Sequence, residues 1–219
     1  MDASKVIKAI EDLAVEVAVW VLLLPKTFVA VFRSPAQVVT GYEASLLSGQ
    51  LQDERYLEPV RFWFLLGPAI LLLDQWLTSN ERAAVAIFGQ SFEKMAAVAT
   101  LILFIAPLAY AWQISIERAL PLTRSNLQNA FRMQCYPFGV ASFIFFVGGL
   151  ILRWSEPLSA VFMLGAFIWH FYAQMVIARS DSRIVFPLGY VFHGGFKMLL
   201  LFAVLVAISG AFYSTGKLG

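Results

Sequence analysis

The sequence predicts an all-α membrane protein, a polytopic membrane helix bundle of five transmembrane helices preceded by an interfacial or re-entrant N-terminal helix. Of its 219 residues, 60% are hydrophobic and 14% are charged, whereas soluble domains are roughly half apolar and a quarter charged. The apolar residues also gather in runs of about 20, the length of helix that crosses a hydrocarbon core. Too little charge remains to cover a soluble surface, so a soluble domain is excluded.

The first element is the segment of residues 13–32, which contains an uninterrupted apolar run only at residues 17–24. That run is too short to cross a bilayer. Pro25 and Lys26 are expected to break it, which favours a helix that lies in the interface or re-enters the membrane. A sixth span is the alternative.

The next segment, residues 33–59, is polar and punctuated by proline and glycine. This pattern predicts a short helix-turn segment on the cytoplasmic side of the membrane. Residues 1–59 are therefore expected to form a cytoplasmic or interfacial N-terminal region, and residues 60–219 a five-helix transmembrane domain. The predicted spans, read from charge to charge, are residues 60–77, 95–116, 133–152, 157–178 and 198–216.

The distribution of Lys and Arg predicts the orientation of these spans. With five spans, twelve of the 16 Lys and Arg residues lie on the side of the N-terminus, and the other four lie opposite. Because loops rich in Lys and Arg stay in the cytoplasm, we expect a cytoplasmic N-terminus and an outside C-terminus. If residues 13–32 also crossed, the count would become ten against six, so five spans fit better.

Polar side chains inside the spans predict a buried face. His170 lies two residues from the middle of the fourth span, and Gln174 follows one turn later on the same side of that helix. Polar groups at such depth face the bundle interior or a wet cavity. The expected partners on the second and third spans are Tyr110, Gln113, Gln134 and Tyr136.

Two roles are open for this intramembrane polar face. The first is a set of hydrogen bonds between helices, each contributing about 0.6 kcal/mol. The second is a proton relay or a substrate contact in which His170 titrates. The sequence favours the first role, because no Asp, Glu, Lys or Arg lies near the predicted midplane to pass a proton onward.

Arginines are expected at headgroup level on the cytoplasmic side, where they favour anionic lipid. They occur in the predicted connection of residues 117–132 and in the turn that follows the fourth span, where Asp181 can pair locally with its neighbours. The predicted lipid-headgroup residues are Arg118, Arg124, Arg132, Arg179 and Arg183.

Catalytic and cofactor signatures are absent from the sequence. There is no H-E-x-x-H, G-x-S-x-G, phosphate-binding P-loop or C-x-x-C motif. Two His and one Cys predict no metal site and no cofactor, and a net charge of +2 gives no reason to expect nucleic acid. We therefore expect a protein that is not an enzyme, and the scattered acids Glu43, Asp53, Glu54 and Glu58 make only a weak case for one.

Two short motifs carry a resemblance to a known family. An "FRSP" step occupies residues 32–35 of the N-terminal region, and a "CYPF" step at residues 135–138 opens the third predicted span. With the five hydrophobic helices, this layout resembles the Yip1-type membrane proteins over nearly the whole chain, particularly their small bacterial relatives. The resemblance implies the bacterial cytoplasmic (inner) membrane. Eukaryotic members imply trafficking through contacts with small GTPases and each other, whereas bacterial relatives are described as permease-like.

Two classes of function follow from the sequence. The first is an accessory or scaffold subunit that assembles with other integral membrane proteins, or with itself, among membrane lipids. The second is a small permease or lipid transporter that uses the polar face of the fourth span. Short outside loops and the lack of midplane charge favour the first, whereas prolines within three spans, Pro68, Pro107 and Pro137, favour the second.

Overall fold

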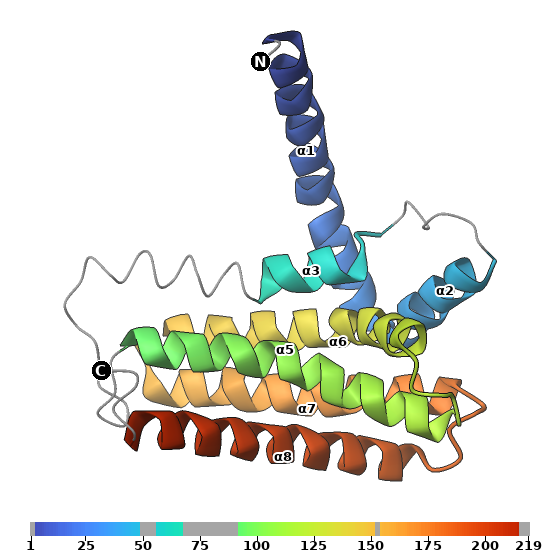
Figure 1. Ribbon diagram of the computed structural model, residues 1–219, viewed down its shortest axis with the longest axis vertical. Helices are drawn as coiled ribbons and strands as arrows, with labels where there is room; N and C mark the ends of the chain where they lie inside the picture. The colour runs from blue at the N-terminus through green and yellow to red at the C-terminus, as the bar shows by residue number, and fades with distance from the viewer. Residues whose placement is uncertain (1–2, 49–55, 68–91, 152–153, 215–219) are drawn as a thin grey trace.

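The computed structural model describes residues 3–48, 56–67, 92–151 and 154–214, and these residues form seven helices and no strand (Figure 1). The predicted all-α fold is thus confirmed. The helices are α1 (Ala3–Arg33), α2 (Pro35–Leu47), α3 (Pro59–Leu66), α5 (Phe92–Glu117), α6 (Arg124–Ile151), α7 (Glu156–Ser180) and α8 (Pro187–Ser214).

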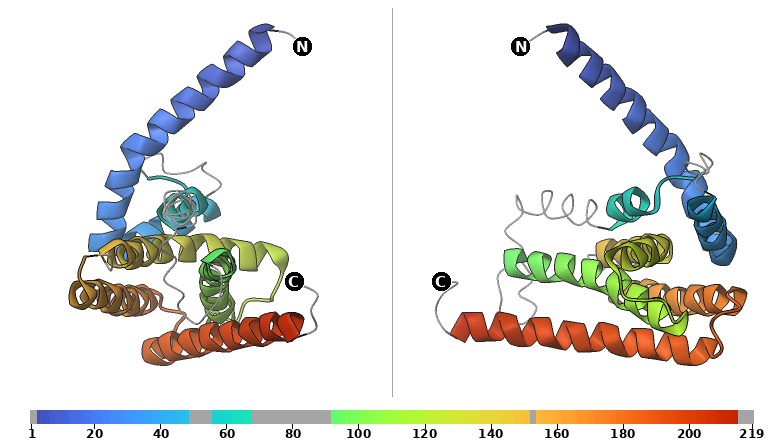
Figure 2. Two further views of the ribbon diagram at one scale, coloured as in Figure 1. Left: turned by 90° about the vertical axis from the view of Figure 1, so that its left-hand side faces the viewer. Right: turned by 45° about the vertical axis from the view of Figure 1, so that its right-hand side comes forward.

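Helices α5 to α8 run antiparallel to one another and form a four-helix bundle (Figures 1 and 2). Each of the four contacts two others, and α6 also contacts α1, α2 and α3. Small residues let α6 occupy this central place. A Cβ atom at Gly139 would lie 2.8 Å from the Phe62 ring of α3, so glycine is needed for the close approach of the two helices.

Three helical segments of the described chain are long and apolar enough to cross a membrane: Lys8–Arg33, Arg124–Ile151 and Glu156–Ser180. Helices α5, with 26 residues, and α8, with 28, also reach the length that a span requires. On α7, an outward row of large apolar side chains is about 60% exposed, namely Val161, Leu164, Phe167 and Ile168. Such a row is typical of a lipid-facing or partner-facing surface.

Helices α6 and α8 begin about ten residues before the predicted spans. The sequence-based limits were residues 133 and 198, whereas the helices begin at Arg124 and Pro187. The predictions stopped at the first charged residue, but backbone hydrogen bonding continues past a charge whose side chain can reach the membrane interface. The connection predicted at residues 117–132 is thus mostly helical. The predicted first span, residues 60–77, is described only as far as residue 67.

Helix α1 corrects the expectation that Pro25 and Lys26 break the N-terminal segment, because it continues through both. In Figures 1 and 2 it rises steeply away from the bundle, and only its C-terminal part packs against other helices. Thr27 and Val31 are fully buried there. The hydroxyl oxygen of Thr27 accepts a hydrogen bond from the Leu57 backbone N–H, 2.8 Å away.

One continuous hydrophobic core joins the N-terminal helices to the bundle. It extends from Val31 and Val38 through Phe62 and Trp63 to Tyr190 and its neighbours. The C-terminal part of α1 and helix α2 are therefore packed against the domain that the sequence predicted from residue 60 on.

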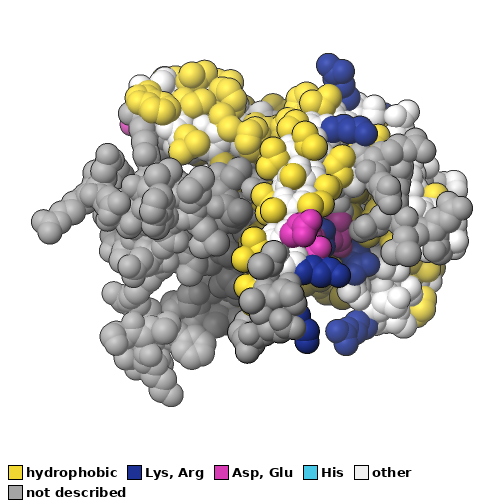
Figure 3. All heavy atoms as spheres, turned by 90° about the horizontal axis from the view of Figure 1, so that it is seen from above, with side chains coloured by type: hydrophobic (Ala, Val, Ile, Leu, Met, Phe, Trp, Pro, Cys, Tyr) yellow, Lys and Arg dark blue, Asp and Glu magenta, His cyan; other side chains and the backbone are white. Residues whose placement is uncertain are grey.

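Charged side chains gather toward one end of the bundle. On the face in Figure 3, the coloured Lys and Arg side chains lie in the right-hand half, on the side of α2. The same end holds the α5–α6 connection and the α7–α8 connection, with Arg118 and Arg183 in them. We call it the charged end of the bundle.

Candidate functional site

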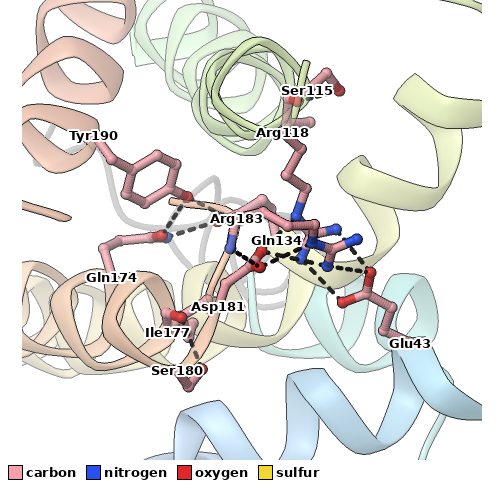
Figure 4. A network of polar contacts seen from close by, with 11 residues as sticks. Glu43, Ser115, Arg118, Gln134, Gln174, Ile177, Ser180, Asp181, Arg183 and Tyr190 are labelled. Carbon is pink, nitrogen blue, oxygen red and sulfur yellow. Dashed lines mark hydrogen bonds and ion pairs between the residues drawn. The ribbon is translucent and has the colours of Figure 1, made fainter. Parts of the chain in front are cut away.

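The polar residues of the bundle form successive groups along its length, beginning at the charged end. The outermost group is an ion-pair cluster of Glu43 on α2, Arg118 after α5, and Asp181 and Arg183 after α7 (Figure 4). The side chains of Arg118 and Asp181 are each only 5% exposed. Three separate segments of the chain thus meet through charges that are largely removed from water.

Arg118 uses all three guanidinium nitrogens in this cluster. Its Nε donates to Asp181 at 2.6 Å, and Nη1 and Nη2 donate to the two oxygens of Glu43 at 2.9 Å each. The planar fork of arginine suits such paired contacts, and the bidentate contact is among the strongest hydrogen bonds in proteins. Ala119, with a left-handed φ of 51°, ends α5 immediately after this arginine.

Asp181 also holds Arg183, its neighbour in the α7–α8 turn, with a 2.9 Å hydrogen bond from Nε. Burial would raise the pKa of the Asp181 carboxyl, but hydrogen bonds from Arg183 and the charge of Arg118 outweigh it and lower that pKa. The hydrogen bonds from Arg183 to Asp181 and Glu43, and the charges of these two carboxylates, raise the pKa of Arg183. Asp181 and Arg183 are therefore both held in their charged forms.

The second group, two turns further in, is a closed ring of three neutral side chains that we call the amide ring. Gln174 Nε2 donates to Gln134 Oε1 at 2.7 Å, and Gln134 Nε2 donates to the Tyr190 hydroxyl at 3.1 Å. That hydroxyl donates back to Gln174 Oε1 at 3.0 Å. All three residues are completely buried. The ring joins α6, α7 and α8 through side chains that carry no charge.

His170 forms the third group, one turn beyond Gln174 on α7. Its ring lies against Phe138, with centroids 4.2 Å apart, and edge-on to Tyr110 at 5.3 Å. Both ring nitrogens are buried, and neither has a hydrogen-bond partner among the described residues. The structure thus brings His170 and Tyr110 together as rings in contact, not through the hydrogen bond that the sequence suggested.

The remaining predicted members of the polar face lie elsewhere. The Tyr110 hydroxyl donates to the Val191 carbonyl, and the Tyr136 hydroxyl donates to the Leu57 carbonyl. Gln113 accepts from Lys197, which lies ten residues into α8, and donates to Glu117 at 2.7 Å. Of the six predicted residues, only Gln134 and Gln174 share a hydrogen bond, and His170 and Tyr110 share a ring contact.

The five arginines predicted to contact lipid headgroups differ in their exposure to solvent. Arg124 and Arg179 are exposed, and Arg132 is half-buried beside Tyr42. Arg118 does not fit a headgroup role, because its side chain is buried and saturated by carboxylates. Arg183 keeps about half of its side chain exposed. The local pairing expected around Asp181 is found with Arg183.

A pocket of about 170 Å³ adjoins the ion-pair cluster at the charged end. Its polar side is formed by Glu43, Arg118, Arg183, Asn126 and Asn129, and its apolar side includes Leu46, Leu47, Leu120 and Met133. The pocket therefore offers both signs of charge, neutral amides and an apolar wall. Among the described residues, no group of three His, Cys, Asp or Glu side chains is placed to hold a metal ion.

Sequence reasoning named Glu43 only as a scattered acid and missed its pairing with Arg118, and it missed Tyr190 and the pocket. Glu43 stands 75 residues from Arg118 along the chain, and no local pattern links the two. Tyr190 lies before the predicted fifth span, so it was not considered as a partner of Gln134.

Comparison with known proteins finds no matching family model, no matching curated protein and no matching solved structure.

Proposed function

We propose that this protein is an integral membrane protein of five spans that serves as an accessory or scaffold subunit, assembling with other membrane proteins or with itself. The observation that carries this proposal is the amide ring. Gln134, Gln174 and Tyr190 satisfy one another in a closed cycle and carry no charge. A polar substrate path needs groups that are free to bind its cargo, whereas these groups hold three helices together.

The five-span topology is supported by the course of the helices. Helices α5 to α8 alternate in direction, and α3 runs along α6 (Figure 1). The arginines after α5 and after α7 meet at one end of the bundle, which fits a cytoplasmic side rich in positive charge. The steep angle of α1 favours an interfacial helix over a sixth span, although its length of 31 residues allows either.

The competing function is a small permease or lipid transporter. One observation favours it: the two ring nitrogens of His170, near the middle of α7, have no partner among the described residues. A polar group left in this state is costly, and such groups often mark a transported ligand or proton.

The experiment that separates the two functions is a pull-down of the tagged protein from its native membrane in a gentle detergent, with every co-purifying protein and lipid identified. A stoichiometric protein partner, or a defined self-assembly, is the expected result. The double variant His170→Leu/Gln174→Leu is then compared with Phe171→Leu, a matched change on the outer side of the same helix.

If the double variant folds and keeps its partner but abolishes the cellular phenotype, the permease takes precedence. A protein that comes out without any protein partner and without self-association contradicts the scaffold.

A further inference from the structure

The pocket at the charged end has the chemistry of a small binding site. A cavity needs roughly 10–15 Å³ to hold one water molecule, so about 170 Å³ has room for a group of several heavy atoms. It is too small for a drug-sized ligand, whose pockets measure about 300–1,000 Å³. The pocket can therefore take a small polar group, with any larger part of the ligand remaining outside it.

The charges around the pocket determine which ligand charges the pocket can accept. The ion-pair cluster has two arginines and two carboxylates and is formally neutral. A ligand with only negative charge would face Glu43, and one with only positive charge would face Arg183, both of which line the pocket. A ligand that carries one charge of each sign can contact both residues without displacing either.

Free hydrogen-bonding capacity remains for both charges of such a ligand. Arg183 uses Nε and Nη2 within the cluster, and no hydrogen bond from its Nη1 occurs among the described residues. The amide of Asn129 likewise has no hydrogen bond in the described part of the chain. Glu43 accepts three hydrogen bonds, out of about four that a carboxylate can accept.

The surroundings of the pocket indicate what the rest of the ligand is. Leu46, Leu47 and Leu120 form part of its wall, and Leu47 is 81% exposed. An exposed leucine beside a charged pocket, at the end of apolar helices, places the pocket where headgroups and acyl chains meet. A pocket with one apolar side and one polar side suits an amphiphilic ligand.

We propose that this pocket binds the headgroup of a zwitterionic phospholipid with a primary amine, such as phosphatidylethanolamine. Its phosphate is held by Arg183 and Asn129, and its ammonium by Glu43. The acyl chains lie along the exposed leucines. This lipid site rests on the proposed function in one respect, that the protein lies in a membrane, and it needs no protein partner. A pull-down that finds no partner would therefore contradict the scaffold and not the lipid site.

The test is native mass spectrometry of the full chain in detergent, titrated separately with phosphatidylethanolamine and phosphatidylglycerol. The amine lipid is expected to bind at least about tenfold more tightly than the anionic lipid, since only the former pairs with Glu43. Equal binding of the two lipids overturns the zwitterionic site. Free phosphoethanolamine is the third probe, and if it binds as tightly as the intact lipid, the ligand is not a lipid.

Two variants locate the site. Arg183→Gln and Asn129→Ala are each expected to weaken binding of the amine lipid by about tenfold. Arg179→Gln, an exposed arginine at the same end and outside the pocket, is the matched control and should bind as the unchanged protein does. Asn129→Ala leaves every ion pair in place, so unaltered binding by this variant overturns the proposal even if Arg183→Gln unfolds.

Discussion

The ion-pair cluster and the amide ring lie only two helical turns apart, yet they satisfy their polar groups in opposite ways. At the charged end, Arg118 and Arg183 are neutralised by Glu43 and Asp181, and the four residues come from three separate segments of the chain. Further in, Gln134, Gln174 and Tyr190 form a cycle without any charge. The cost of burying a charge rises with distance from water. Of these two groups, the ions lie at the more exposed end and the neutral amides further in.

The two regions also differ in what they join. The amide ring links three helices of the bundle to one another, whereas the cluster ties α2 to both connections at the charged end. The cluster also borders the pocket of about 170 Å³. This difference fits the proposed packing role of the interior and the proposed binding site at the charged end.

The largest expected effect comes from Arg118→Met. It removes the buried guanidinium and leaves the half-exposed Arg183 as the remaining partner of Glu43 and Asp181. Breaking a buried ion pair costs about 3–5 kcal/mol. We expect a correspondingly lower unfolding midpoint in detergent, measured by thermal denaturation. Arg179→Met, at an exposed position, is the control and should change stability by less than about 0.5 kcal/mol. Equal stability of the two variants would contradict the claim that the ion-pair cluster stabilises the fold.

Acid should weaken the cluster and spare the ring. The folded-state pKa of Asp181 is lowered, so its stabilising contribution is complete above the usual carboxyl pKa of about 4 and disappears as pH falls through the lowered value. The unfolding midpoints of the unchanged protein and of Asp181→Asn should therefore differ at pH 7 and converge below about pH 4. A difference that stays constant down to pH 3 contradicts this assignment.

Breaking the ring should cost less. Gln174→Leu leaves the Gln134 carbonyl and the Tyr190 hydroxyl without their partner, and we expect a loss of about 1–2 kcal/mol. Adding Gln134→Leu should cost less than the sum of the two single changes, because the same bond is removed in both. Thermal denaturation of the four proteins gives this double-mutant cycle, and strict additivity would show that the two amides act independently.

The smallest effect is expected at His170. Because its ring nitrogens have no partner among the described residues, His170→Leu should leave stability within about 0.5 kcal/mol of the unchanged protein, or raise it. The same thermal measurement checks this. A loss of stability above about 2 kcal/mol would contradict this expectation. It would mean that the imidazole makes a stabilising interaction besides its ring contacts with Phe138 and Tyr110.

Gln174, which the sequence placed on an inward-facing side of the fourth span, is completely buried in α7. The predicted spans begin about ten residues after the actual starts of α6 and α8. The prediction was limited by the nearest charged residue, whereas each helix continues past that charge. Arg118 was assigned to lipid because its partner Glu43 is remote in sequence. Only the folded chain brings these two residues together.

The membrane class and the helical fold thus follow from composition and length, which are properties of the whole chain. The contacts of individual polar residues do not, because each depends on which helices become neighbours. Tyr190 illustrates this. Nothing in its own segment distinguishes it from other interfacial tyrosines, yet it closes the amide ring.

The proposed packing role requires that water does not enter the interior of the bundle. Cys135 tests it directly, because it is the single cysteine of the chain, it is completely buried, and it follows Gln134 of the amide ring on α6. The measurement is labelling by a small water-soluble maleimide in native membranes, compared with labelling after denaturation. The account predicts that Cys135 reacts only in the denatured protein. Rapid labelling in the intact membrane would show that water reaches the interior, which contradicts the packing role and favours a permease.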